Sequence, residues 1–153
     1  MTEVTTLGPA GAELLAAIHA EAFDPAVSGD AWEAKAFTEL LSLPGTAALL
    51  AGRDGDPLGF VLLRTAADEA EILTLATRPA ARRRGVARGL LSAAARTAQA
   101  AGAATLFLEV AATNAAALAL YAGFGFSAVG RRRCYYRLSG GPVDAVVMAR
   151  PLP

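Results

Sequence analysis

The chain of 153 residues contains only one cysteine, Cys134, and one histidine, His19. A single cysteine cannot form an intrachain disulfide, and this usage is typical of a reducing compartment. One histidine and one cysteine far apart cannot build a zinc cage, so we expect no metal. We interpret His19, beside Ile18 on a predicted helix, as a structural or surface residue. Cys134 has no visible histidine partner for nucleophilic catalysis, and we expect it to pack as a small thiol.

Long apolar runs are also missing, although 54% of the residues are hydrophobic. Much of this fraction is alanine, which buries little surface. No window approaches the roughly 18 uninterrupted apolar residues of a transmembrane helix, so we expect no contact with a membrane. The first residues lack the positively charged start and apolar run of a secretory signal, and the sequence therefore predicts a cytoplasmic protein.

Acidic and basic residues are unevenly distributed, although the formal net charge is zero. Residues 1–71 contain twelve acidic and three basic residues, whereas residues 72–153 contain two acidic residues and eleven arginines. A basic half of this kind is typical of contact with nucleic acid or with a phosphate-bearing cofactor, and also of an ordinary solvated face. Composition alone does not choose among these interpretations.

Hydrophobic periodicity predicts one domain over residues 1–153, with about four helices and about seven strands. The dipeptide Asp54-Gly55 between two strands is a strong hairpin signal, and Gly102 is suited to end a helix. Strands and helices do not alternate strictly, so their order predicts an α/β (α+β) fold with a mixed, mainly antiparallel sheet. The predicted helices are residues 11–23, 32–43, 85–101 and 114–122, and the predicted strands are residues 4–7, 46–53, 58–65, 71–77, 105–110, 126–136 and 143–149.

An arginine-rich turn, Arg82-Arg83-Arg84-Gly85-Val86-Ala87-Arg88, follows the predicted strand that ends at Thr77. A helix N-terminus presents unpaired backbone N–H groups and a partial positive charge, and both attract phosphate. Gly85 and Ala87 leave the backbone open to an anion, and the arginines add charge that can reach it. The segment lacks the Gly-Lys-Ser/Thr of a Walker A loop. The plainer alternative is an ordinary strand-to-helix turn with solvated arginines.

Glu109 and Tyr121 are candidates for proton transfer. Glu109 is the only acidic residue between residues 72 and 143, and it lies in an apolar strand. A carboxylate in that position should be partly desolvated, which suits a general base. The alternative is a structural carboxylate paired with a nearby arginine. Tyr121, on the next helix, could donate a proton to a leaving group, or it could be a core aromatic whose hydroxyl finds a partner.

These segments together resemble the GNAT acetyltransferase superfamily. Its signature (Gln/Arg)-x-x-Gly-x-(Gly/Ala) is filled by Arg82-x-x-Gly85-x-Ala87, between a strand and a helix. The resemblance implies a GNAT-like fold with acetyl-coenzyme A as cosubstrate. It also implies that backbone amides of the turn hold the pyrophosphate and that the preceding strand pairs with the pantetheine arm. The residues implied in cofactor binding are Leu75, Ala76, Thr77, Arg82, Arg83, Arg84, Gly85, Val86, Ala87, Arg88, Asn114 and Tyr121.

Over roughly residues 30–150, and most strongly from residue 71 onward, the sequence resembles one subfamily, the bacterial ribosomal-protein-alanine N-acetyltransferases. The matching segments include Leu108-Glu109-Val110, Thr113-Asn114 and Arg132-Arg133-x-Tyr135-Tyr136. This resemblance implies that Glu109 accepts a proton and Tyr121 donates one. It implies as acceptor the α-amino group of an N-terminal alanine on a small-subunit ribosomal protein.

The resemblance implies that three aromatic residues, Trp32, Tyr135 and Tyr136, lie on the acceptor side of the site. Trp32 is flanked by Ala31 and Glu33 and so lacks the Pro-Trp-Ser context of the resembled family. Adjacent strand residues face opposite sides of a sheet, so we expect at most one of the two tyrosines to line the acceptor groove. The acidic N-terminal half would suit a basic acceptor peptide.

Three other functions remain compatible with parts of the sequence. An acetyltransferase for a small amine would use the same cofactor site and differ in its acceptor groove. A nucleic-acid-binding module could use Arg82–Arg84 and Arg131–Arg133. The chain lacks zinc-finger ligands and an aromatic RNA-binding motif, so we expect no direct contact with nucleic acid. A non-catalytic acyl-coenzyme A sensor would not need both Glu109 and Tyr121.

Overall fold

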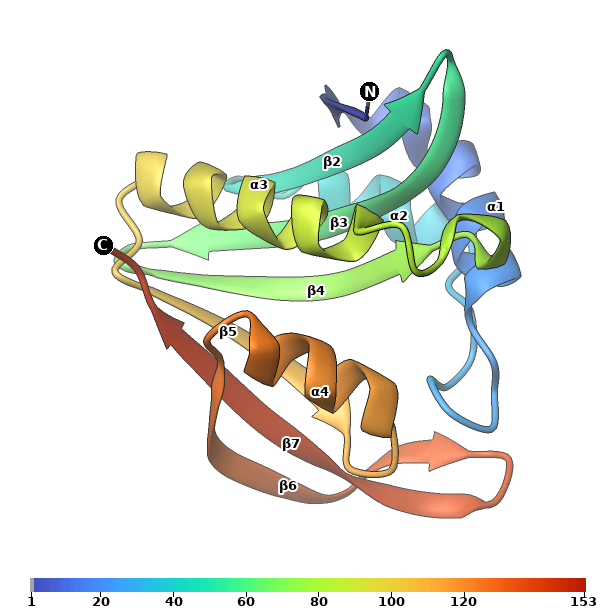
Figure 1. Ribbon diagram of the computed structural model, residues 1–153, viewed down its shortest axis with the longest axis vertical. Helices are drawn as coiled ribbons and strands as arrows, with labels where there is room; N and C mark the ends of the chain where they lie inside the picture. The colour runs from blue at the N-terminus through green and yellow to red at the C-terminus, as the bar shows by residue number, and fades with distance from the viewer. Residues whose placement is uncertain (1) are drawn as a thin grey trace.

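A seven-stranded sheet with helices on both faces forms the framework of the computed structural model, which describes residues 2–153 (Figure 1). Its strand order is β1-β2-β3-β4-β5-β7-β6, and within these residues β4 and β5 form the one parallel pair. The predicted fold class and element order are confirmed. No helix in this part of the chain is long and apolar enough to cross a bilayer. The strands are β1 (Glu3–Leu7), β2 (Thr46–Arg53), β3 (Asp56–Ala66), β4 (Glu69–Thr77), β5 (Thr105–Ala111), β6 (Ser127–Leu138) and β7 (Gly141–Pro151), and the helices are α1 (Ala12–Ala22), α2 (Ala34–Leu41), α3 (Val86–Ala100) and α4 (Ala115–Gly123), with 3-10 turns η1 (Pro9–Gly11) and η2 (Pro79–Ala81).

Strand β3 supplies side chains to two separate cores, one on each face of the sheet. Val61 and Leu63 belong to the core under α3 and α4, whereas Phe60 and Leu62 belong to the core under α1 and α2. This division follows from the alternation of side chains along a strand. All four are at most 1% exposed, and burying each contributes roughly 1.5–3 kcal/mol. The strand is therefore the rigid centre on which the neighbouring β4 is held.

Local sequence signals set the ends of several elements as predicted. Asp54 and Gly55 both have positive φ, 53° and 79°, as the two-residue turn between β2 and β3 requires. Gly102 has φ 96° just beyond the end of α3. The Asn114 side chain caps α4, its Oδ1 accepting a hydrogen bond from the Ala117 N–H at 3.2 Å. These caps fix the positions of α3 and α4, the two helices nearest the predicted cofactor-binding residues.

Two sequence-based expectations are wrong. The second helix begins at Ala34 rather than Trp32, because the backbone of Glu33 is extended (φ −83°, ψ 163°) and makes this residue the N-cap. The Trp32 backbone N–H, outside the helix, donates to His19 Nδ1 at 3.0 Å. Cys134 does not pack as a buried thiol. It is exposed on β6 with φ 51°, and its backbone N–H donates to Asp144 Oδ1 at 2.9 Å.

Candidate active site

Strands β4 and β5 pair over only part of their length. Glu69–Ile72 lie in register with Thr105–Leu108, and beyond this point the two strands separate. Among the described residues, the strand partner of Leu75–Thr77 is β3 alone. The other edge of this segment is thus free to bind an extended ligand through backbone hydrogen bonds. Pairing of Leu75, Ala76 and Thr77 with a pantetheine arm stays a prediction, for which this free edge is the structural requirement.

The separation begins next to a bulge in β4. Leu62 of β3 lies opposite Thr74, but the next residue, Leu63, lies opposite Ile72, which leaves Leu73 without a partner in β3. A bulge of this kind bends a strand and turns the following side chains to the other face. Thr74 therefore points toward α1 instead of joining Ile72 beneath α3.

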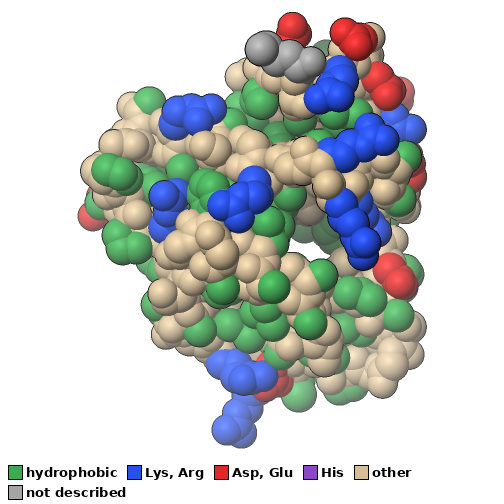
Figure 2. Space-filling model, viewed as in Figure 1, with side chains coloured by type: hydrophobic (Ala, Val, Ile, Leu, Met, Phe, Trp, Pro, Cys, Tyr) green, Lys and Arg blue, Asp and Glu red, His purple; other side chains and the backbone are tan. Residues whose placement is uncertain are grey.

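A cavity of about 840 Å³ opens where β4 and β5 separate. Its volume falls within the range of roughly 300–1,000 Å³ that small-molecule sites occupy. In Figure 2, which has the same viewpoint as Figure 1, the surface is hollowed between α3 and α4, and Lys and Arg side chains lie beside the hollow. Within residues 2–153, no group of three or more His, Cys, Asp and Glu residues forms a metal site. The predicted site residues that line the cavity are Trp32, Leu75, Ala76, Thr77, Arg82, Ala87, Glu109, Asn114, Tyr121, Tyr135 and Tyr136, whereas Arg83, Arg84, Gly85, Val86 and Arg88 belong to the adjoining turn.

The turn before α3 has the geometry of an anion site. Gly85 is the N-cap of the helix, with a left-handed φ of 78° that favours glycine, and the space in front of its Cα is open. No side chain among residues 2–153 caps this helix end. The first backbone N–H groups of α3 are therefore available to a phosphate. Arg83, Arg84 and Arg88 are exposed around the turn and add positive charge.

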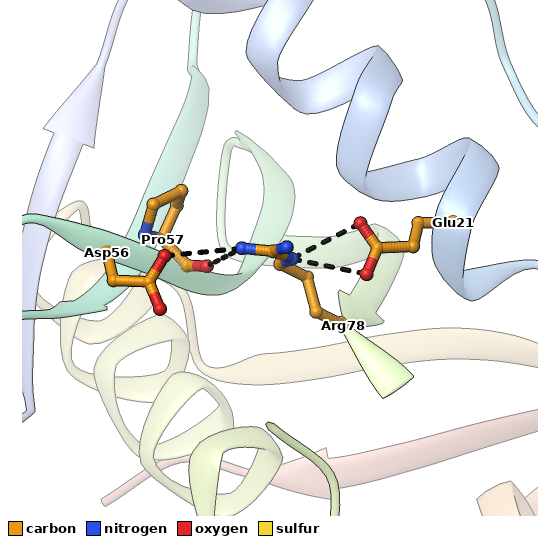
Figure 3. A network of polar contacts seen from close by, with 4 residues as sticks. All are labelled: Glu21, Asp56, Pro57 and Arg78. Carbon is orange, nitrogen blue, oxygen red and sulfur yellow. Dashed lines mark hydrogen bonds and ion pairs between the residues drawn. The ribbon is translucent and has the colours of Figure 1, made fainter. Parts of the chain in front are cut away.

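Arg82 and Arg78 hold this turn in place rather than pointing freely into solvent. The Arg82 Nη2 donates to the carbonyl oxygen of Ala22, at the end of α1, at 2.8 Å. Arg78 Nε lies 3.2 Å from a Glu21 carboxylate oxygen, and Nη1 lies 3.3 Å from Asp56 Oδ1 and donates to the Pro57 carbonyl at 3.1 Å (Figure 3). The start of the turn is thus bound to both α1 and the β2–β3 hairpin. A contact between the Arg82 side chain and phosphate stays a prediction, and no local sequence pattern indicates this carbonyl partner.

Glu109 and Tyr121 approach the cavity from opposite faces of the sheet. Leu108 and Val110 pack in the α3 and α4 core, so the intervening Glu109 points to the other face. Tyr121 extends from α4 and packs partly against the α3 and α4 core, with its ring centroid 5.9 Å from that of Phe126. Both side chains line the same cavity because the sheet is open at this point. A reacting group in the opening would have a carboxylate on one side and a phenol on the other.

Two of the three tyrosines that line the cavity, Tyr121 and Tyr136, remain protonated well above neutral pH. Burial raises the pKa of Tyr121 to about 12. Burial also raises the pKa of Tyr136 to about 12, with the negative charge of Glu109 adding to the effect. Either hydroxyl can therefore serve as a proton donor at neutral pH.

Glu71 is a cavity carboxylate that sequence reasoning missed. It lies on β4 opposite Phe107 of β5, two residues from Glu109 on the same side of that strand. Burial raises its pKa, the nearby Glu109 charge raises it further, and Arg132 acts in the opposite direction. Its position between the buried residues Ala70 and Ile72 was a usable signal, because it puts Glu71 on the face that Glu109 shares.

Tyr135 and Tyr136 both line the cavity, which corrects the expectation that at most one would. The register of β6 with β7 shifts between Arg132 and Tyr136, and Cys134 within this stretch has positive φ. The bulge cancels the alternation on which the expectation rested. The two rings meet edge to face with centroids 5.2 Å apart.

His19 lies behind the cavity wall and forms hydrogen bonds to two segments of it. The ring is fully buried, its Nδ1 accepts the Trp32 N–H, and its Nε2 lies 3.0 Å from Thr74 Oγ1. Because Nδ1 is an acceptor, the neutral ring carries its proton on Nε2 and donates it to Thr74. Phe23 stacks on the ring with centroids 3.7 Å apart. His19 thus joins α1, the bulged part of β4 and the Trp32 loop, and of the two roles expected for it the structural one is correct.

Comparison with known proteins decides the family. The acetyltransferase (GNAT) family matches residues 12–126. The chain belongs to the GNAT acetyltransferases. It is 37% identical over 156 residues to N-alpha-acetyltransferase RimI of Mycobacterium tuberculosis, covering 97% of this chain and 94% of that protein. It is 39% identical over 100 residues to the ribosomal protein bS18-alanine N-acetyltransferase of Escherichia coli K12, covering 65% of this chain and 68% of that protein.

Solved structures agree with this assignment. The crystal structure of the ribosomal-protein-S18-alanine N-acetyltransferase from Escherichia coli superimposes with a TM-score of 0.86 at 32% identity, covering 99% of this chain and 94% of that one. As a GNAT enzyme, the chain is an acetyl-coenzyme A-dependent N-acetyltransferase. The open β4 edge, the uncapped start of α3 and the cavity volume fit this cosubstrate.

Proposed function

We propose that this GNAT enzyme acetylates the α-amino group of a protein N-terminus, with an N-terminal alanine of a small-subunit ribosomal protein as the acceptor. Glu109 acts as general base and Tyr121 as general acid. The observation that carries the proposal is that these two side chains enter one cavity from opposite faces, where β4 and β5 separate. The names of the relatives from Escherichia coli and Mycobacterium tuberculosis support the choice of acceptor.

The proposed reaction moves three protons. The acceptor ammonium gives a proton to the Glu109 carboxylate, and the freed amine attacks the thioester carbonyl carbon. A carbon–nitrogen bond forms, the carbon–sulfur bond breaks, and the departing sulfur takes a proton from the Tyr121 hydroxyl. The nitrogen loses its second proton as the amide forms, and this proton restores the Tyr121 hydroxyl. With a pKa of about 12, Tyr121 keeps this proton at neutral pH until negative charge develops on sulfur. The thioester supplies the activated acyl group, so the protein contributes position and proton transfer.

The acceptor would enter beside Trp32, Tyr135 and Tyr136. The tip of the β6–β7 hairpin and the loop between α1 and α2 meet there (Figure 1), and the Ser139 N–H donates to the Pro25 carbonyl oxygen at 3.1 Å. Both segments contribute residues to the cavity wall. A passage enclosed in this way favours a free chain end over the middle of a folded chain.

Turnover of acetyl-coenzyme A, followed by thiol release, tests the proposal on two acceptors. One is an arginine-rich hexapeptide that begins with alanine, and the other is the same peptide blocked at its α-amino group. Glu109→Gln and Tyr121→Phe should each lower kcat by about 10²–10⁴-fold. Glu69→Gln is the matched control, because Glu69 is an exposed β4 carboxylate outside the cavity. Tyr136→Phe tests the second protonated cavity phenol.

Each outcome has a distinct meaning. Turnover on the free peptide alone, reduced in both variants, supports N-terminal acetylation by this pair. A lower kcat in Tyr136→Phe, without a lower kcat in Tyr121→Phe, would assign the role of general acid to Tyr136. Turnover on the blocked peptide would point to side-chain amines, and tight coenzyme A binding without any turnover would point to a small-amine acceptor.

A further inference from the structure

The carboxylate of Glu109 already has a cationic partner inside the cavity. Arg132 Nε lies 2.8 Å from Glu109 Oε1, and both residues line the cavity wall. The Glu109 side chain is 16% exposed, whereas the Arg132 side chain is 58% exposed. Most of the Arg132 side chain is thus in solvent, while its charged end reaches a largely buried partner.

Arg132 lies opposite Ala145 of β7, directly before the bulge in β6. The guanidinium also lies over the Tyr135 ring, 5.3 Å from its centroid. A carboxylate on one side and an aromatic face on the other are the groups that bind an organic cation. Arg132 therefore occupies a cation site built from Glu109 and Tyr135, at the side of the cavity opposite the α3 and α4 core.

A second carboxylate adds negative charge near Glu109, which favours a cation at this point. Glu71 lies on the same face, and its electrostatic partners are Glu109, with the same charge, and Arg132, with the opposite charge. With Arg132 withdrawn, two carboxylates would face each other without compensation. An incoming ammonium group restores the balance, whereas an uncharged acceptor does not.

We propose that Arg132 holds the place of the acceptor's ammonium group on Glu109 in the free enzyme and is displaced by it, so that Arg132 selects for cationic acceptors. This inference rests on the proposed role of Glu109 as the base for the acceptor amine. One cation replaces another, so the carboxylates stay compensated while the acceptor binds. The released guanidinium needs only a change of side-chain rotamer to become fully hydrated, because its stem already lies in solvent.

The test compares Arg132→Gln with Arg133→Gln. Arg133 is an exposed neighbour on the same strand that does not line the cavity, so the two variants change the net charge equally. Arg132→Gln should lower both the KM of the alanine-initiated peptide and its Kd for the coenzyme A-loaded enzyme by about five-fold, as removal of a competing ion pair predicts. Arg133→Gln should change neither by more than about two-fold. Calorimetry with the same peptide gives the Kd.

The two proposals fail in different ways. Wild-type turnover on the peptide, without tighter binding in Arg132→Gln, overturns the displacement of Arg132 and leaves the N-terminal acetyltransferase proposal intact. An equal gain of peptide affinity in Arg133→Gln also overturns the displacement of Arg132, because net charge alone would then explain the tighter binding. Peptide binding that tightens only in Arg132→Gln, but without turnover, keeps the displacement and overturns the proposed acceptor. Absence of both binding and turnover overturns both.

Discussion

Lowering the pH should destabilise the enzyme through His19, the one histidine in the chain. Burial lowers its pKa from 6.5 to about 4, so the folded state binds a proton less tightly than the unfolded state. The stability that the neutral ring contributes is therefore complete above about pH 6.5. It is lost as the pH falls, and the loss levels off below about pH 4.

The size of this loss follows from the change in pKa. One pKa unit corresponds to about 1.4 kcal/mol, so the fall from 6.5 to about 4 sets an upper limit of about 3 kcal/mol. Near pH 5.5 the expected loss is about 1.4 kcal/mol. Total stability of a domain is typically about 5–15 kcal/mol, and 1 kcal/mol shifts Tm by roughly 2–4 °C at this chain length. Full protonation should therefore lower Tm by roughly 6–12 °C.

Unfolding in urea at several pH values between about 4 and 7.5 measures this effect, with His19→Gln as the comparison. Glutamine keeps a donor and an acceptor but does not titrate, so its stability curve should be flatter across this range. Glu71, whose pKa is raised, contributes with the opposite sign in both proteins, because the folded state binds its proton more tightly. Parallel curves for the two proteins would refute the reasoning. They would mean that His19 gains its proton without cost to the fold.

Three further predictions concern the turn, the cavity phenols and the Arg78 contacts. Gly85→Ala should destabilise the protein by about 1–2 kcal/mol, because alanine is strained at the left-handed φ of this position. The same variant should bind acetyl-coenzyme A more weakly when the affinity is measured by calorimetry. Gly89→Ala, in open space on the same helix, should neither destabilise the protein nor weaken binding. Titration followed by phenolate absorbance should show two of the three tyrosines ionising near pH 12. Tyr121→Phe and Tyr136→Phe should each remove one of these late steps, and an unchanged curve would contradict the assignment. Arg78→Ala should lower the free energy of unfolding by about 1–2 kcal/mol in urea, and a change below about 0.3 kcal/mol would mean that its contacts in Figure 3 are only superficial.

The sequence predicted those parts of the fold that short-range patterns control. Hydrophobic periodicity predicted the helix at residues 85–101, and its apolar residues Leu90, Leu91, Ala94 and Ala98 are all fully buried on one face of α3. The turn at Asp54-Gly55 fixed the β2–β3 hairpin through its positive φ values. In each case the residues that determine the structure are close together in the chain.

The parts that the sequence did not predict depend on long-range contacts or on extra residues in a strand. The bulge around Cys134 adds two residues to β6, and no local pattern reveals it, yet it brings both Tyr135 and Tyr136 to the cavity. The carbonyl partner of Arg82 lies on α1, 60 residues earlier. The proximity of Glu71 to Glu109 depends on the parallel register of β4 and β5, which puts Glu71 opposite Phe107 and which only the folded sheet defines.

The separation of β4 and β5 leaves an unpaired strand edge inside the molecule. An edge of this kind normally lies at the border of a sheet, where it can pair with another chain and promote aggregation. In the predicted complex, the pantetheine arm of acetyl-coenzyme A takes the place of the missing strand. At a coenzyme A concentration one hundred times its Kd, binding would stabilise the fold by about 2.7 kcal/mol. The supply of coenzyme A would then influence how long each copy of the enzyme survives, in addition to how fast it works.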